Sequence, residues 1–185
     1  MPLSLRRRRP TIQTAADMAA TTFLALALSC SPLVDDKTAA ALVSVESGFN
    51  PNAIGVVGGA LERQPRDRRE AIATTRALES SGWNFSVGLA QINVRNLQRL
   101  GLSVEAAFDP CRNLAAMQAL LKDCFDRASG RAHSPQRSLR QALSCYYSGN
   151  FVTGFRDGYV SRVVGAARLS GTRPTSLLPT IKESS

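Results

Sequence analysis

Apolar residues recur at helical spacing along most of this 185-residue chain, and strand-like patterns are confined to two short segments. The clearest helical segment runs from Pro110 to about Ala128, where apolar side chains return every three or four residues on one face. Asp109 and Pro110 form a favourable N-cap and first helical position for it. Strand patterns are limited to residues 54–61 and 83–89. The sequence therefore predicts a mainly α fold of the α+β kind, a helical bundle with a small β element.

Other predicted helices have start and stop residues that can be identified. Asp67 and Glu70 match a capping box, Asn93 can cap a short helix, and Gly149 can end a later one. A last apolar stripe begins at Tyr159. We expect helices over residues 38–47, 67–80, 93–100, 139–148 and 159–167.

Glu46 lies at the end of the first of these helices, for which Asp36 is the expected N-cap and Gly48 the stop. Leu42 and Val43 precede Glu46 by four and three positions, so the carboxyl group shares their apolar face. Burial there disfavours the charged form and raises the pKa, which suits a general acid. The alternative is a partly exposed glutamate at a helix terminus.

Two further segments extend this pattern. Residues 86–93 read Ser-Val-Gly-Leu-Ala-Gln-Ile-Asn, and residues 142–150 read Ala-Leu-Ser-Cys-Tyr-Tyr-Ser-Gly-Asn, followed by Tyr159-Val160. Together with Glu46-Ser47, in this order, they resemble the soluble lytic transglycosylases, which are peptidoglycan-cleaving enzymes with a lysozyme-like domain. The resemblance runs from about Phe23 to about Ala167. It implies a lysozyme-like fold with a glycan-binding cleft.

Two more segments resemble one branch of that family. Residues 50–59 and 108–114 are similar to the transglycosylases of type IV secretion and conjugation machines, which open the cell wall locally for the channel. The resemblance implies peptidoglycan strands and type IV secretion components as partners. It also implies a location in the bacterial periplasm or cell envelope.

The resemblance implies a mechanism with one carboxyl group. Glycoside cleavage usually employs two, yet no second acidic residue of this sequence lies beside an apolar wall as Glu46 does. Glu46 would protonate the bond between N-acetylmuramic acid and N-acetylglucosamine, and would then deprotonate the muramyl C6 hydroxyl, which attacks C1. The expected product is a 1,6-anhydromuramyl end. Two alternatives stay open: a non-catalytic peptidoglycan-binding or scaffold module, and a hydrolytic lysozyme.

Other motif residues receive roles from the same resemblance. Gln91 and Asn93 would hydrogen-bond the sugars, although capping can account for Asn93. Tyr146 matches the family tyrosine whose hydroxyl lies near the acid, with core packing as the alternative. Ser47 would orient the acid. Many family members carry Asn where this chain has Tyr147, which suggests stacking on a sugar face.

The charge pattern argues against a nucleic-acid partner. Of the net charge of +9, Arg6 to Arg9 supply four and the tail from Ser170 one, which leaves the body at about +4. Its basic residues are scattered among acids, whereas nucleic-acid readers concentrate them on one face. No group of Cys, His or acidic residues has metal-ligand spacing, and His133 lies in a polar stretch. We therefore expect neither metal nor cofactor.

The ends of the chain divide it into three parts. We expect a disordered basic segment at 1–16, the enzyme domain at 17–168 and a disordered tail at 169–185. The apolar run from Met18 after the arginines can be a signal peptide or the first helix of the domain. Residues 19, 23, 26 and 30 have helical spacing, which favours the helix. The run is too interrupted for a stable membrane span, and the export route stays open.

The four cysteines allow two disulfide patterns. Cys111 and Cys124 are thirteen residues apart on one predicted helix, which separates them by roughly 20 Å and prevents their bonding to each other. Cys30 can therefore pair with Cys111 while Cys124 pairs with Cys145, or Cys30 with Cys124 while Cys111 pairs with Cys145. Four reduced, buried cysteines are the alternative.

Overall fold

The structure is a computed structural model that describes residues 15–130 and 134–171. The basic run Arg6–Arg9, His133 and most of the predicted tail lie outside the described residues. The helices are α1 (Ala15–Cys30), α2 (Asp36–Ser47), α3 (Arg68–Ser80), α4 (Val94–Leu97), α5 (Val104–Ala107), α6 (Pro110–Ser129), α7 (Pro135–Ser148), α8 (Thr153–Arg156) and α9 (Tyr159–Gly171), with a 3-10 helix η1 (Gln98–Leu100). The strands are β1 (Ile54–Val56), β2 (Phe85–Val87) and β3 (Ile92–Asn93).

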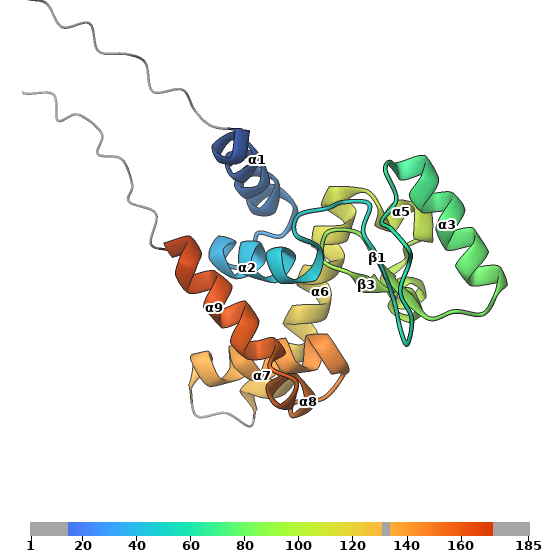
Figure 1. Cartoon of the computed structure of the whole chain (residues 1–185). Helices are drawn as coiled ribbons and strands as arrows, with labels where there is room; N and C mark the ends of the chain where they lie inside the picture. The colour runs from blue at the N-terminus through green and yellow to red at the C-terminus, as the bar shows by residue number, and fades with distance from the viewer. Residues whose placement is uncertain (1–14, 131–133, 172–185) are drawn as a thin grey trace, which may run out of the picture.

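The helices form the larger part of the molecule, and the sheet lies beside them (Figure 1). Helix α6 packs against α1 and α7, and α2 packs against α9. Leu42 of α2, Leu114 and Met117 of α6 and Val163 of α9 are buried in the shared core. Each such side chain contributes about 1.5–3 kcal/mol through removal from water. The predicted mainly α fold with a small β element is confirmed.

The sheet is antiparallel, in the order β1-β2-β3. Ile54 pairs with Val87, and Val87 pairs with Ile92. The strands at 54–56 and 85–87 are shorter than the expected ranges. Gly88, with φ +79°, ends β2 and turns the chain into β3, a two-residue strand that the sequence pattern did not predict.

Local capping signals account for most helix boundaries. Asp67, Asn93 and Asp109 accept hydrogen bonds from backbone N–H groups in the first turns of α3, α4 and α6, as predicted. The expected cap at Asp36 is wrong. Asp35 caps α2 instead, because its carboxylate accepts the Thr38 N–H at 3.0 Å, and Asp36 is the first helical residue.

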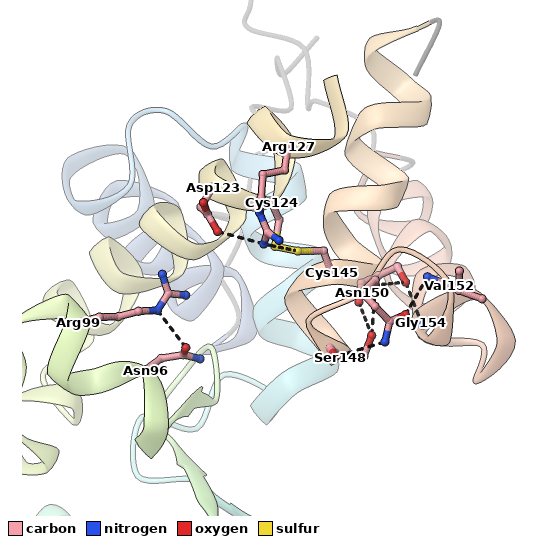
Figure 2. Close-up of a disulfide and its surroundings, with 11 residues drawn as sticks. Asn96, Arg99, Asp123, Cys124, Arg127, Cys145, Ser148, Asn150, Val152 and Gly154 are labelled. Carbon is pink, nitrogen blue, oxygen red and sulfur yellow. Dashed lines mark hydrogen bonds and ion pairs between the residues drawn. A yellow bond between two sulfur atoms is a disulfide. The ribbon is translucent and has the colours of Figure 1, made fainter. Parts of the chain in front are cut away.

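Two disulfides connect the helices. Cys30 at the end of α1 is bonded to Cys111 of α6, and Cys124 of α6 is bonded to Cys145 of α7. This is the first of the two patterns that helix geometry allowed. In Figure 2, Arg127 lies against the second disulfide, with Nη2 2.9 Å from the Cys145 sulfur and 3.0 Å from the Asp123 carboxylate.

The first described helix follows the predicted stripe in part, since Phe23 and Cys30 are buried and Leu26 is partly buried. Phe23, Ala27 and Cys30 of α1 are buried, whereas Leu28 is exposed. Within residues 15–130 and 134–171, no helix has both the length and the apolar character needed to cross a membrane. Helices α1 and α9 each extend by a few residues past the predicted domain boundaries at 17 and 168.

Candidate active site

Glu46 occupies the last turn of α2, where the helix meets the sheet region (Figure 1). Leu42 and Val43 are fully buried on its face, whereas Glu46 itself is half-buried. Gly48 ends the helix in the left-handed region with φ +59°, and Phe49 follows with φ +66°. The turn leaves the carboxyl group at the margin of the core, as the sequence predicted, with part of the side chain open to solvent.

A tyrosine from the other end of the domain contacts this carboxyl group. The hydroxyl of Tyr159, the first residue of α9, donates a hydrogen bond of 2.5 Å to Oε1 of Glu46. The ring of Tyr159 is buried and stacks on Tyr147 of α7, with centroids 4.6 Å apart and planes at 17°. The guanidinium of Arg162 lies 6.0 Å from the centre of the Tyr159 ring.

These neighbours set the proton affinity of the acid. Burial raises the pKa of Glu46 to about 7, even though the Tyr159 hydrogen bond and the positive charge of Arg162 both lower it. Among the described residues, no lysine or arginine lies within ion-pair distance of Glu46. Because its pKa is near neutral, the group can hold a proton and also accept one, as acid and base chemistry requires.

The loop at residues 88–91 contacts the end of α2. Two side-chain hydroxyls hold it through hydrogen bonds to the loop's backbone carbonyls. The hydroxyl of Ser47 donates to the Leu89 carbonyl at 2.7 Å. The hydroxyl of Tyr146 donates to the Ala90 carbonyl at 2.6 Å. Burial, and then the negative charge of Glu46, raise the pKa of Tyr146. Both residues therefore fix the loop, and the Tyr146 phenol lies within electrostatic range of the acid.

Asn113 of α6 anchors the same loop from the core side. Its amide nitrogen donates to the carbonyls of Val87 and Ala107 at 3.0 and 2.7 Å, and its oxygen accepts the Ala90 N–H at 2.8 Å. Gly88 lies against this amide, and a Cβ there would be 2.3 Å from the Asn113 nitrogen. The loop thus requires glycine both for its positive φ and for this close approach.

The structure gives the two amide residues of the loop motif internal partners. Gln91, with φ +50°, donates from its side chain to the carbonyls of Ala53 and Gly88 at 3.1 and 3.0 Å. Asn93 caps α4 and donates to the Ser86 hydroxyl at 3.3 Å. Their roles in sugar binding stay predictions, as does sugar stacking on Tyr147, whose side chain is 44% exposed.

The structure adds Tyr159 to the predicted set. Sequence reasoning used Tyr159 in a family motif and a packing stripe, without a chemical role. Its partner Glu46 lies 113 positions away, and no local pattern reports such a contact. Within the described residues, no cluster of His, Cys, Asp or Glu could hold a metal ion.

Comparison with known proteins decides the family. Residues 23–162 match the family model described as the transglycosylase SLT domain. The chain belongs to this transglycosylase family. The predicted resemblance and the lysozyme-like α+β fold are thereby confirmed, and the protein is a peptidoglycan lytic transglycosylase.

Individual relatives of this transglycosylase share the designation virB1. The chain is 48% identical over 167 residues to "Type IV secretion system protein virB1" of Brucella suis biovar 1, covering 87% of this chain and 70% of the relative. It is 37% identical over 161 residues to "Protein virB1" of Agrobacterium tumefaciens, covering 85% of this chain and 63% of the relative. The predicted resemblance to the secretion-linked branch is confirmed. No solved structure gave a significant match.

The glycan-binding cleft of the transglycosylase stays a prediction. The structure has a hollow of about 360 Å³ between α2, α7 and α9, but it is lined by residues such as Leu139 and Val164, and not by Glu46. Glu46 and the residues that contact it therefore define the candidate site.

Proposed function

We propose that Glu46 alone supplies the acid and the base of this lytic transglycosylase, and that the product carries a 1,6-anhydromuramyl end. The observation that carries the proposal is the half-buried carboxyl group, which has a pKa of about 7 and a tyrosine hydroxyl at 2.5 Å. Among the described residues, the side chains that lower this pKa against burial are Tyr159 and Arg162, and neither is a carboxyl group. A mechanism with one carboxyl group follows more directly from this environment than one with two.

In the first step, protonated Glu46 gives its proton to the oxygen that joins N-acetylmuramic acid to N-acetylglucosamine. The bond from the muramyl C1 to that oxygen breaks, and positive charge develops at C1. Glu46 is left as a carboxylate. The hydrogen bond from Tyr159 favours this charged form and holds the carboxylate in place for the second step.

In the second step, the Glu46 carboxylate removes the proton of the muramyl C6 hydroxyl. The C6 oxygen attacks C1 of the same sugar, which closes the anhydro ring and restores protonated Glu46. No water is consumed. An attacking group within the same sugar gains from enforced proximity, and the acetamido group of the substrate can share the charge at C1.

The surrounding residues support this chemistry in the proposal. Ser47 and Tyr146 fix the loop at 88–91 through its carbonyls. Gln91 and Asn93 would form hydrogen bonds to the sugars through side-chain donors or acceptors that are not used within the protein. The exposed ring of Tyr147 would stack on a sugar face. Residues 17–168 would form the whole catalytic domain.

The biological setting of the proposal is the cell envelope. The virB1 names of the relatives support local wall opening for a type IV secretion or conjugation channel, with secretion components as partners. The two disulfides support an oxidising compartment such as the periplasm.

Digestion of purified peptidoglycan followed by mass spectrometry tests the proposal. We expect soluble fragments with anhydromuramyl ends from the natural protein and none from Glu46→Gln. Fragments with reducing muramyl ends would identify a hydrolytic lysozyme instead. Wall binding without any fragments, equal in the natural protein and the variant, would identify a scaffold module.

A further inference from the structure

Arg162 stands beside the acid on the first turns of α9. It follows Tyr159 by three positions, so both side chains lie on one face of the helix. Its guanidinium lies 6.0 Å from the centre of the Tyr159 ring, and its positive charge lowers the pKa of Glu46. The side chain is exposed to solvent. An exposed cation therefore lies within electrostatic range of Glu46.

Most donors of this guanidinium have no protein partner within the described residues. Nη1 donates to the Asp157 carbonyl at 3.1 Å, which is its one hydrogen bond there. The nearby Asp157 carboxylate is engaged by Arg156 at 2.8 Å, and no carboxylate of the described residues forms an ion pair with Arg162. An arginine has five N–H donors in a planar fork that matches a carboxylate.

The sugar that Glu46 would cleave carries such a group. Muramic acid differs from glucosamine by a lactyl ether on C3, which is two carbons along the ring from C1. The lactyl carboxyl is free where the stem peptide has been removed, and where the peptide is present it bears carboxylates of its own. The lactyl carboxylate lies within about one sugar ring of the bond being broken, and the carboxylates of the stem peptide lie farther out on the same C3 substituent.

We propose that Arg162 binds a carboxylate of the muramyl C3 substituent, and so selects muramyl-containing glycans with an anionic substituent. The inference rests on the proposed function of Glu46. A hydrogen bond to the Asp157 carbonyl holds the guanidinium over the Tyr159 ring. The charges of Glu46 and Asp157 act on Arg162 from a distance, and substrate supplies the ion-pair partner that it lacks among the described residues. The stacked pair of Tyr147 and Tyr159 gives this site a rigid apolar side.

A competing role would be purely electrostatic, since Arg162 lowers the pKa of Glu46. Loss of Arg162 would then raise that pKa and change rates near neutral pH on every substrate. Rates at pH 5 remove this effect, because Glu46 is protonated there with and without Arg162. A preference for charged strands at pH 5 that depends on Arg162 therefore reports its interaction with the substituent, and not a change in the pKa of Glu46.

The experiment compares charged and neutral versions of one glycan. Peptide-bearing strands and amidase-stripped strands are each divided, and in one half the carboxylates are converted to methylamides. The natural protein, Arg162→Gln, Arg162→Lys and the matched control Arg168→Gln are assayed for kcat/KM at pH 5. Arg168 is an exposed cation at the far end of α9. Thermal melting checks that each variant is folded.

We expect the natural protein and Arg168→Gln to favour a charged strand over its methylamide by about threefold to tenfold, the range of an exposed charge-assisted contact. Arg162→Gln should lose this preference, and Arg162→Lys should keep part of it. A preference confined to stripped strands identifies the lactyl carboxylate as the ligand, and one confined to peptide-bearing strands identifies the stem. Either result supports the inference.

An equal preference in the natural protein and Arg162→Gln would overturn it, as would a natural protein without any preference. Failure of the proposed function looks different. In that case the natural protein would release no anhydromuramyl product from any of the strands.

Discussion

The hydroxyl of Tyr159 donates a 2.5 Å hydrogen bond to Oε1 of Glu46, although 113 positions separate the two residues. This contact joins the end of α2 to the start of α9, the two helices whose packing spans the core. It also acts against burial, because a hydrogen bond to a carboxylate favours the charged form. The acid thus has a pKa of about 7, and without the bond it would be higher.

Tyr159→Phe should move the alkaline limb of the pH–rate profile to higher pH by about one unit, because it removes one hydrogen bond to the charged form. Activity requires protonated Glu46, so kcat/KM of the natural protein should fall above about pH 7. The measurement is kcat/KM on purified wall from pH 5 to 9. A lower maximal rate with an unmoved alkaline limb would contradict the assigned role.

Glu46→Gln should abolish lytic activity and change the pH dependence of stability. The folded-state pKa of Glu46 is raised from 4.5 to about 7, so the folded protein binds more protons than the unfolded chain between these values. Its stability therefore falls as pH rises through that window. Glutamine does not ionise, and the variant should gain about 3 kcal/mol relative to the natural protein between pH 4 and pH 8.

Urea unfolding of both proteins at pH 4, 6 and 8 measures this gain. Equal pH dependence in the two proteins would show that Glu46 titrates as an exposed carboxyl group does. The acid would then lack the environment on which its catalytic role depends.

The helices could be predicted because their signals are local. Asp109 with Pro110 and Asn93 each mark a helix start within a few residues, and Gly48 marks an end; the structure confirms these three. The apolar helix face that carries Glu46 could likewise be predicted, because Leu42 precedes it by four positions. Where two adjacent residues could both act as a cap, the pattern failed, since Asp35 and not Asp36 caps α2.

The contacts of the site could not be predicted, because they depend on tertiary structure. The Tyr146 hydroxyl donates a hydrogen bond to a backbone carbonyl. Every residue has such a carbonyl, so the sequence does not indicate which one is the partner. The sequence pattern predicts Tyr159 as a core residue. Its contact with Glu46 depends on the packing of α9 against α2. Strand β3 is two residues long and has no alternation to detect. Helix geometry excluded one cysteine pairing, but only the packing of α1 on α6 distinguishes the other two.

Asn113→Ala should destabilise the protein by about 3 kcal/mol or more. The substitution leaves the Ala90 N–H and the carbonyls of Val87 and Ala107 buried without their partner, and each unmade bond costs about 1–3 kcal/mol. The loop at 88–91 should loosen, and activity should fall with it. Asn96→Ala, which removes one exposed hydrogen bond to Arg99, is the matched control and should cost under about 0.5 kcal/mol.

Urea unfolding gives the free energy of unfolding of both variants, and wall-lysis rates give their activity. A cost for Asn113→Ala no larger than that of Asn96→Ala would show that the loop does not depend on the buried amide. Activity retained in a strongly destabilised variant would separate the loop from catalysis.

The two disulfides should differ in what their removal affects. The Cys30–Cys111 bond closes 81 residues and the Cys124–Cys145 bond 21, so the chain-entropy model assigns them about 4.5 and about 3 kcal/mol. Paired alanine variants should follow this order in urea unfolding. Activity should follow the opposite order, because Cys145 is next to Tyr146 on α7, whereas the first bond anchors α1. Greater loss of lysis at 20 °C in the variant lacking Cys30 and Cys111, with both variants folded, would show that α1 and not α7 positions the site.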